Sequence, residues 1–476
     1  MLHLFFSICL LIFLFLPIES SAFPWTMDED IVEAKKSFYH FIVDSSVTRF
    51  LNEDHNRYAS RAEIKARQFL SSRFLFQIKT DYTYNWTEDY HYFRPSEFNI
   101  QFERPDGKWF FGRKREIWDW ADSFWNRGLW QPSYTDDALR PKWAGLTGVF
   151  RHFNYESGQI GLFGSFIFIP NFTPPFENKK GKLVSKNPWF IPPPGKIGST
   201  NIVPVYKTPH PPLTDFLKLS FGGRASYKGT YIAYAYKPMN KIKLKSPIKL
   251  PLYKEPVGSH EEGYLVKTPL EPVILHHHLL SGGFVIQTTE PTPDIKGNTN
   301  YFLKASITYN HPETHTPGTA KWLFFPPQRE WHLSAKGEMQ IKDQEEETTL
   351  HIGYTHRIQM EGEKNIPSKV FPDIKKQIFR DDLFQFSRAV SGGLSHSIAF
   401  DKTYSAQFKI RVIYHLLHEY FLLSFYGSLM FEKSFSIFIS GDLLFSDFPF
   451  TIEQTKKNID IYANKSRIFG GISYAF

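Results

Sequence analysis

Long stretches in which apolar and polar residues alternate one by one dominate the chain after residue 38. The segment 97–103 reads EFNIQFE, the segment 404–412 reads YSAQFKIRV, and the segment 331–341 follows the same rule. Successive side chains of a β-strand point to opposite faces, so each segment has one apolar and one polar face. The polar faces carry full charges. The chain is therefore expected to be all-β.

We find about eighteen such segments and expect about 16–18 strands, an even number being typical of a closed antiparallel barrel. The segments lie near 38–51, 59–70, 73–83, 96–104, 108–117, 144–154, 159–169, 214–224, 229–237, 271–286, 299–309, 331–341, 347–357, 383–400, 403–414, 420–431, 435–445 and 467–476.

The connections between these segments nearly alternate between short and long. The short ones include 105–107, 155–158, 401–402 and 432–434, and the long ones are 118–143, 170–213, 238–270, 310–330, 358–382 and 446–466. In an up-and-down antiparallel meander every second connection falls at the same end. Tight turns at one rim and large loops at the other are typical of transmembrane barrels with short periplasmic turns and long extracellular loops. A soluble sandwich or a propeller has no reason to sort its loops in this way.

The composition agrees with a barrel. Aromatic residues make up 17% of the chain, yet the mean hydropathy is −0.34. A helical membrane bundle needs a positive hydropathy, and a disordered chain is poor in aromatic residues. A barrel in which lipid-facing and lumen-facing residues alternate accommodates both properties.

The N-terminus has the pattern of a secretory signal peptide. Residues 2–17 are almost entirely apolar, and Ser20-Ser21-Ala22 is a small-x-small cleavage pattern, so we expect a cleaved signal peptide at 1–22 and a barrel at 23–476. The chain's one cysteine, Cys9, lies in the signal peptide. The mature chain is then exported and has no disulfide or thiolate chemistry.

The last strand ends in a pattern that identifies a protein class. Residues 467–476 read RIFGGISYAF, with Gly470, Tyr474 and Phe476 on one face. This end resembles the assembly signal of Gram-negative outer-membrane β-barrel proteins, and the whole mature chain resembles large porin-like barrels. The resemblance implies that the barrel-assembly machinery reads Tyr474 and Phe476. It also implies a bacterial outer-membrane location, among outer-membrane lipids and lipopolysaccharide.

Charged residues on the polar faces are expected to line the lumen, because a charge on the lipid face costs about 2–4 kcal/mol at the membrane midplane. The pore-lining candidates are Arg61, Lys65, Arg67, Lys79, Glu97, Glu103, Lys336, Glu338, Lys409 and Arg411. A barrel of this size is too wide for wall side chains alone to fill, so the lumen is expected to hold water or a loop. Cations outnumber anions among the candidates, which favours anionic solutes.

The connections carry further signals. The Trp-rich stretch 118–130 is expected to be a loop or a short helix, and the 170–213 connection either folds inward as a constriction or covers the mouth. A basic stretch is either a solvated loop or a contact for anionic lipopolysaccharide. It contains Lys237, Lys241, Lys243, Lys245, Lys249 and Lys254.

No catalytic, metal or cofactor site is predicted. Strand alternation lets His276 and His278 share a metal, but no third ligand is apparent. Adjacent Ser395 and His396 point to opposite faces of a strand and cannot form a nucleophile–base pair with each other.

The sequence therefore predicts a porin-like channel through which small hydrophilic solutes diffuse or are exported, not an enzyme. Its lumen is polar and narrowed by an inward loop. An export location excludes nucleic acid as a partner, and the oligomeric state is left open. The alternatives are a structural or surface-adhesion barrel and a barrel-embedded hydrolase.

Overall fold

The computed structural model describes most of the chain. The described residues are 38–51, 56–172, 176–180, 182–190, 202–207, 216–246, 252–253, 264–269, 271–291, 298–313, 321–322, 328–343, 345–359, 386–400, 403–416, 420–432, 434–445 and 465–475. The expected signal peptide at 1–22 lies outside them and stays a prediction.

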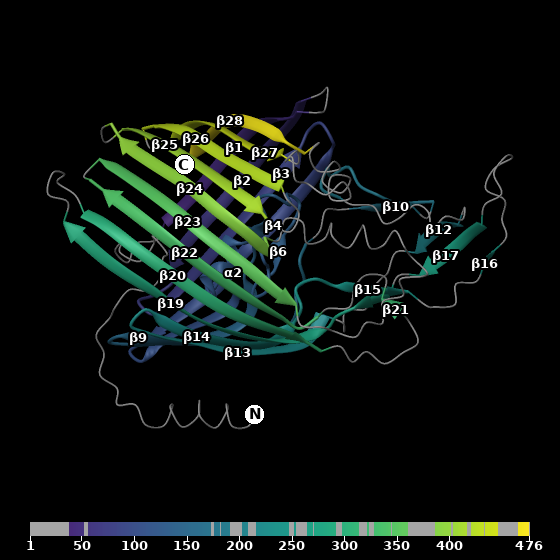
Figure 1. The fold of residues 1–476 in the computed structure, drawn as a ribbon, viewed down its shortest axis with the longest axis horizontal. Helices are drawn as coiled ribbons and strands as arrows, with labels where there is room; N and C mark the ends of the chain where they lie inside the picture. Colours follow the sequence, from purple (N-terminus) through teal and green to yellow (C-terminus); the bar gives the residue numbers. More distant parts are fainter. Residues whose placement is uncertain are drawn as a thin grey trace.

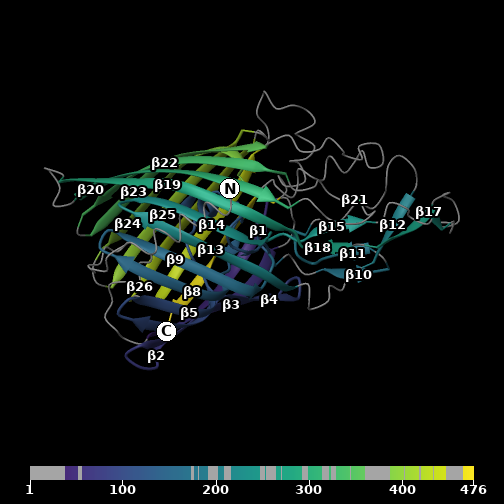
Figure 2. The same cartoon turned by 90° about the horizontal axis from the view of Figure 1, so that it is seen from below.

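Eighteen strands form one antiparallel barrel, seen from two directions in Figures 1 and 2. Each strand pairs with the next along the barrel, and the first strand, β1 (Phe38–Phe50), also pairs with the last, β28 (Arg467–Ala475). That pairing runs from Ile42 opposite Ala475 to Phe50 opposite Arg467 and closes the sheet on itself. The prediction of an all-β, up-and-down antiparallel barrel is confirmed, and every predicted segment corresponds to one of its strands.

The remaining strands of the barrel are β2 (Asn56–Phe69), β3 (Phe74–Asn85), β4 (Tyr90–Arg104), β5 (Gly107–Lys114), β8 (Leu146–Tyr155), β9 (Gly158–Ile167), β13 (Leu217–Tyr227), β14 (Thr230–Pro238), β19 (His276–Pro291), β20 (Asn298–Pro312), β22 (Glu330–Lys342), β23 (Glu346–Gln359), β24 (Arg388–Ala399), β25 (Tyr404–His415), β26 (Tyr420–Phe431) and β27 (Phe435–Phe445).

The outer face of the barrel is apolar. Phe41 pairs with Ile64, and Ile78 pairs with Phe98, so these side chains share one face of the sheet. Exposed side chains on this face include Phe98 at 53% and Ile352 at 66%. Such exposure would destabilise a protein in water, whereas in a bilayer these side chains meet lipid.

The strand order sorts the connections as predicted. The connections 105–106, 156–157, 228–229 and 343–345 lie at the end that also holds the start of β1 and the last residues of β28, and we call it the turn end. The long connections begin and end at the other rim, which we call the loop end. Because consecutive strands run antiparallel, every second connection lies at the same rim.

Strand β4 begins earlier than predicted. It starts at Tyr90 rather than near 96, and its pairing with β3 shifts register between Lys79 and Thr80. This irregularity places Pro95 opposite Thr80. A bulge is one of the few places where a sheet tolerates proline, which has no N–H for the ladder.

Small sheets and one short helix complete the described structure. Figure 2 shows the strands β10, β12, β15, β17 and β21 beyond one end of the barrel. These elements are β10 (Glu177–Lys179), β11 (Lys182–Val184), β12 (Ile202–Lys207), β15 (Lys243–Ser246), β16 (Leu252–Tyr253), β17 (Tyr264–Pro269), β18 (Glu271–Val273) and β21 (Lys321–Trp322), with β6 (Ser133–Tyr134), β7 (Lys142–Trp143) and α2 (Trp120–Phe124) in an earlier connection. Among the described residues, no helix is both long and apolar enough to cross a membrane.

Candidate functional site

The connection between β5 and β8 folds back into the barrel. It covers residues 115–145, which we call the inserted segment, and it contains α2, β6 and β7. Figure 1 shows α2 within the outline of the barrel, and its side chains bond to strands far away in the sequence. The predicted short helix near 118–130 is therefore present, and its place is the lumen.

Asp119 attaches the start of α2 to the wall. Its carboxylate caps the helix by accepting the backbone N–H of Ala121 at 3.0 Å. The same carboxylate accepts the hydroxyls of Tyr231 on β14 at 2.8 Å and Thr308 on β20 at 2.7 Å. A buried carboxylate requires hydrogen-bond donors on several sides, and here two strands and the helix backbone supply them.

Asp122 closes a tight loop after α2. Its carboxylate accepts the backbone N–H groups of Leu129 at 2.8 Å and Trp130 at 3.1 Å. Burial raises the pKa of Asp122 to about 6, and the nearby Asp119 carboxylate adds to the shift. This carboxyl group thus changes charge only slightly below neutral pH.

Arg127 joins this loop to a second part of the wall. Its guanidinium donates to Ser334 on β22 and, at 2.6 Å, to Thr355 on β23. The side chain is almost completely buried, and burial lowers the pKa of Arg127. Deep burial of a guanidinium is tolerated here because Asp119 and Asp122 lie near enough to oppose the shift.

Two ion pairs hold the far end of the inserted segment. Arg140 donates from Nε and Nη2 to the carboxylate of Asp442 on β27, at 3.0 Å and 2.9 Å. Asp137 accepts from Arg467 on β28 at 2.7 Å, and Arg467 also bonds to Asp442 at 2.8 Å. Asp442 is fully buried and also accepts the Ser424 hydroxyl at 2.8 Å.

A third charged contact joins the segment to β3 and β4. Arg94 of β4 pairs with Asp136 of the segment and with Asp81 of β3. Lys142 of the segment donates to Asp81 at 3.2 Å. Burial, together with the positive charges of Arg94 and Arg61, lowers the pKa of Lys142 to about 8.

Phe124 places an aromatic ring over basic side chains of the wall. The Lys336 ammonium lies 4.7 Å and the Arg411 guanidinium 4.3 Å from the ring centroid. Arg411 also donates to the backbone carbonyl of Phe124 at 2.9 Å. A cation over the face of a ring is attracted by the ring quadrupole, so this contact attaches α2 to β22 and β25.

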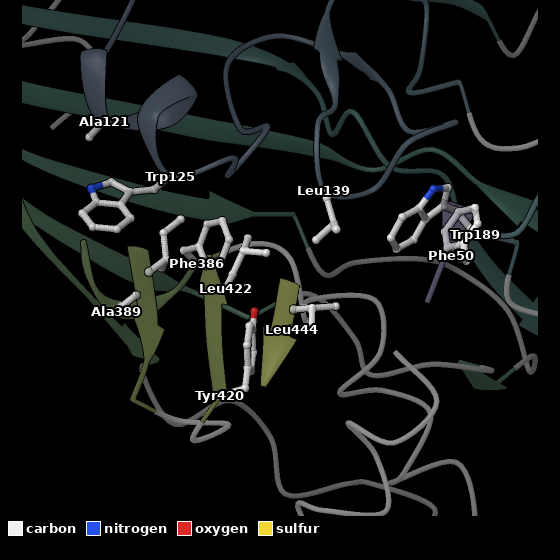
Figure 3. Packing of buried hydrophobic residues seen from close by; sticks show 11 residues of the cluster. Phe50, Ala121, Trp125, Leu139, Trp189, Phe386, Ala389, Tyr420, Leu422 and Leu444 are labelled. Atoms are coloured by element: carbon white, nitrogen blue, oxygen red, sulfur yellow. The ribbon is translucent and has the colours of Figure 1, made fainter. Parts of the chain in front are cut away.

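Apolar clusters fill the space between the segment and the wall. Figure 3 shows Trp125 in one cluster with Phe386 and Ala389, with Leu139 farther along the same cluster. In a second cluster the rings of Trp118 and Trp130 stack with centroids 5.5 Å apart. They pack against inward-facing wall residues that include Ala233, Ala235 and Leu279.

The inserted segment thus crosses the lumen. It is bonded to β3, β4, β14, β20, β22, β23, β25, β27 and β28. These strands belong to opposite sides of the barrel. A solute that moves through the barrel must pass beside this segment. The sequence left open whether the 170–213 connection enters the lumen; its described residues contribute Trp189 to the cluster around Leu139.

Two of the predicted pore-lining residues of β2–β4, Arg61 and Lys65, join an ion-pair network. Arg61 pairs with Glu63 and lies 3.4 Å from Asp81, and Lys65 lies 3.2 Å from Glu63. These side chains are on the face opposite to the exposed Ile64. Arg67 and Lys79 share that inner face. The carboxylate of Glu97 accepts the backbone N–H of Arg115 at 2.9 Å, so it supports the start of the inserted segment.

The predicted residues of β22 and β25 form a second group. Lys336 pairs with Glu338, and the register of β22–β25 places His351, Gly393 and Arg411 in line with Glu338. Lys409 lies on the same inner face, between the exposed Phe408 and the outward Ile410. Glu103 differs from the others, because it pairs with Lys108 at 3.2 Å beside the turn 105–106. That all these residues line a solute path stays a prediction.

Two further sets of predicted residues are placed only in part. Tyr474 is on the outer face of β28, 44% exposed, on the same face as Gly470 and Ile472, and Phe476 lies outside the described residues. Their role in assembly stays a prediction.

Lys237, assigned to the basic stretch, is buried, and its ammonium donates to Asn240 at 2.7 Å. It is therefore not available to an anionic lipid.

Sequence reasoning missed the residues that attach the inserted segment, above all Asp119, Arg127, Arg140 and Asp442. Each bonds to a partner that is distant in the sequence, so no local spacing identifies the pair. The available signal was the density of tryptophan in 118–130, since rings of that size need a buried surface to cover them. Among the described residues, no three His, Cys, Asp or Glu side chains are grouped as a metal site requires.

Comparison with known proteins finds similar structures but no similar sequence. No protein-family model and no curated protein matches the chain. OccAB1 of Acinetobacter baumannii is similar at 10% identity and a TM-score of 0.44, over 92% of this chain and 96% of that one. OpdL of Pseudomonas aeruginosa is 8% identical, with a TM-score of 0.44 over 92% and 98% of the two chains. The outer membrane protein OprD of Pseudomonas aeruginosa is 8% identical, with a TM-score of 0.41 over 92% and 93%. Identities and scores this low say nothing about the solute or the activity of this chain.

Proposed function

We propose that this barrel is an outer-membrane channel for small hydrophilic solutes and that it favours anions. The observation that carries the proposal is the inserted segment, which is attached across the lumen between walls that carry fixed charges. A channel needs a water-filled path and a constriction that selects by size and charge. The segment supplies the constriction, and the charged inner faces supply the polar path.

The inner wall opposite β2–β4 is rich in cations. Lys304, Lys336, Lys409 and Arg411 face the lumen on β20, β22 and β25, with Glu338 among them. On the other side, the network of β2 and β3 includes Arg61, Lys65, Glu63 and Asp81. A surplus of cations along a narrow passage lowers the energy of an anion more than that of a cation.

A second candidate function is that of a surface-adhesion or structural barrel. It is favoured by the small sheets beyond the barrel, which include β10 with β11 and β12 with β17. Channel and adhesion functions predict different behaviour in a bilayer, because an adhesion barrel has no need of an ion path past the segment.

The decisive experiment is conductance of the purified protein in a planar bilayer. We expect discrete ion-permeable steps, with a reversal potential in a KCl gradient that shows anion preference. Lys409→Glu should shift this potential toward cation preference. The matched control is Lys179→Glu, which makes the same charge change on the exposed β10 outside the barrel. The absence of steps would overturn the channel, and equal shifts in both variants would overturn the assigned path.

A further inference from the structure

Histidines are grouped on the outer face of the barrel, close to the loop end. His276 and His278 of β19, His311 of β20 and His356 of β23 share this face. Pairing places His278 opposite His311 and Leu333 opposite His356, and the exposed Leu280 and Ile307 lie on the same face. An imidazole on a surface that meets only lipid tails raises the free energy of the folded protein unless both ring nitrogens have hydrogen-bond partners.

Neighbouring tyrosines hold these imidazoles in place. The Tyr234 hydroxyl is 2.9 Å from Nδ1 of His278, and the Tyr309 hydroxyl is 3.2 Å from Nδ1 of His311. The rings of Tyr236 and His276 stack with centroids 4.9 Å apart. The tyrosine hydroxyls thus bond to Nδ1 of His278 and His311. Nε2 of each ring is directed away from its tyrosine.

This surface, which we call the histidine belt, lies at the loop-end rim of the barrel. Strand β19 begins at His276, and strand β20 ends at Pro312, one residue beyond His311. Strand β24 begins at Arg388, which is exposed on the outer face opposite His356. Rings at this level meet lipid headgroups rather than acyl chains.

The charges around the belt are mixed, with cations in excess. Glu313 accepts the Tyr236 hydroxyl at 3.2 Å and acts electrostatically on both His276 and His311. Lys218 and Lys237 act on His276, but Lys237 does so from the inner side of β14, where it is buried and bonds to Asn240. Arg329 and His278 act on His311. With protonated imidazoles, the belt and the adjoining arginines form a cationic strip at headgroup level.

We infer that the histidine belt binds the phosphate groups of an anionic lipid of the outer leaflet, more tightly at acidic than at neutral pH. This inference rests on the membrane placement of the barrel and not on the proposed channel. Phosphate complements the strip because it accepts several hydrogen bonds from Nε2–H and guanidinium donors. The rings of Tyr309 and Trp331, whose centroids lie 4.5 Å apart, provide the apolar ledge on which the lipid's glycan or glycerol rests.

The probe is the purified full chain in phosphatidylcholine vesicles that contain bisphosphorylated lipid A. Lipid retained by the protein is measured by native mass spectrometry at about pH 4.5 and about pH 7.5, the lower value lying well below an ordinary histidine pKa. We expect retention to be about five-fold greater at the lower pH, the effect of roughly one surface charge on an anionic headgroup.

The test variant is His276→Gln/His278→Gln/His311→Gln, and the matched control is His396→Gln. His396 also faces outward, opposite the exposed Phe408, but near the turn end, and Nδ1 lies 2.9 Å from Thr348. The triple variant should lose the pH-dependent retention, and the control should keep it. A second variant, Arg329→Gln/Arg388→Gln, keeps every histidine. It should weaken retention of the lipid at both pH values. Heat-modifiable gel mobility checks that each variant is folded.

Retention that is equal for dephosphorylated lipid A, or unchanged in the triple variant, would overturn the inference. So would binding of inorganic phosphate as tight as that of the lipid, since the site would then not be one for a headgroup. Conductance of the same preparations separates the two proposals. A protein that conducts but does not retain the lipid refutes only the belt, and one that retains the lipid without conducting refutes only the channel.

Discussion

The attachment of the inserted segment to β27 and β28 gives the sharpest test of the constriction. The side chain of Asp442 is fully buried and bonds to Arg140, Arg467 and Ser424. Asp442→Asn keeps the shape of the side chain but removes the negative charge. Among the described residues, Arg467 then keeps Asp137 as its carboxylate partner, and Arg140 loses the bond that holds the segment.

Breaking a buried ion pair by removing one partner costs about 3–5 kcal/mol. We take the lower end, about 3 kcal/mol, because Arg140 is 34% exposed and Arg467 keeps its contact with Asp137. That cost falls on the contact between the segment and the wall. It corresponds to about a 150-fold rise in the equilibrium constant for local detachment of residues 136–145.

Amide hydrogen exchange measures this detachment directly. The N–H of Ala144 donates to Pro132 at 2.9 Å, and that of Gly145 donates to Ser96 at 2.9 Å, so both report on the end of the segment. Their exchange should accelerate by about two orders of magnitude in Asp442→Asn. The same variant should show larger or noisier conductance steps, because the constriction is held less firmly.

The matched control is Glu103→Gln, which also removes the carboxylate of an ion pair. The pair of Glu103 with Lys108 lies near the turn end with side chains 40% and 36% exposed, so its loss should change little. Exchange of residues 136–145 that stays within about two-fold of wild type in Asp442→Asn would refute the reasoning. Equal acceleration in both variants would show a global effect and refute it as well.

Three further predictions concern the segment and its frame. Burial raises the pKa of Asp122 from 3.8 to about 6, so its contribution to stability is fully present below the lower value and is lost as pH rises through the higher one. The free energy of unfolding from urea titration should fall by about 2 kcal/mol more between about pH 4 and about pH 7 in wild type than in Asp122→Asn. Trp125→Ala removes a fully buried ring and should lower the free energy of unfolding by about 3–5 kcal/mol, measured in the same way. Gly107→Ala should lower the free energy of unfolding, measured by urea titration, by more than about 1 kcal/mol. Gly107 has φ +138°, and a Cβ there would overlap the carbonyl oxygen of His152.

The strands were predictable because a membrane barrel has two different solvents on its two faces. In segment 97–103 the phenylalanines face lipid and the polar residues face the interior, so the two-residue period is visible in the sequence itself. The sorting of connections followed from antiparallel order alone. The bulge at Lys79 and the early start of β4 were not predictable, because they depend on how Pro95 fits a neighbouring strand.

The inserted segment was predictable as a loop but not as a constriction. Asp119 binds Thr308 of β20, and Arg140 binds Asp442 of β27, both far away in the sequence. Such pairs leave no pattern along the chain. Local sequence also mispredicted the exposure of Lys237. Its charge suggested an exposed loop, whereas at the end of β14 its side chain faces inward and bonds to Asn240.

Breaks in the alternation nevertheless mark where the segment meets the wall. Strand β14 reads TYIAYAYKP, and its residues 231–236 are apolar or aromatic on both faces, which lipid on one side alone does not explain. Its inward residues Ala233 and Ala235 are buried against the cluster that holds Trp118 and Trp130. Small inward residues leave room for large rings from the segment, and the burial of those rings stabilises the contact without any charge. A stretch of strand that is apolar on both faces is thus a sequence signal of a docked loop. A bulky polar substitution such as Ala233→Gln should detach the Trp118–Trp130 end of the segment while the outer face of β14 is unchanged. Faster exchange of the Trp130 amide, which donates to Asp122, would show this detachment, and unchanged exchange would refute the docking role of β14.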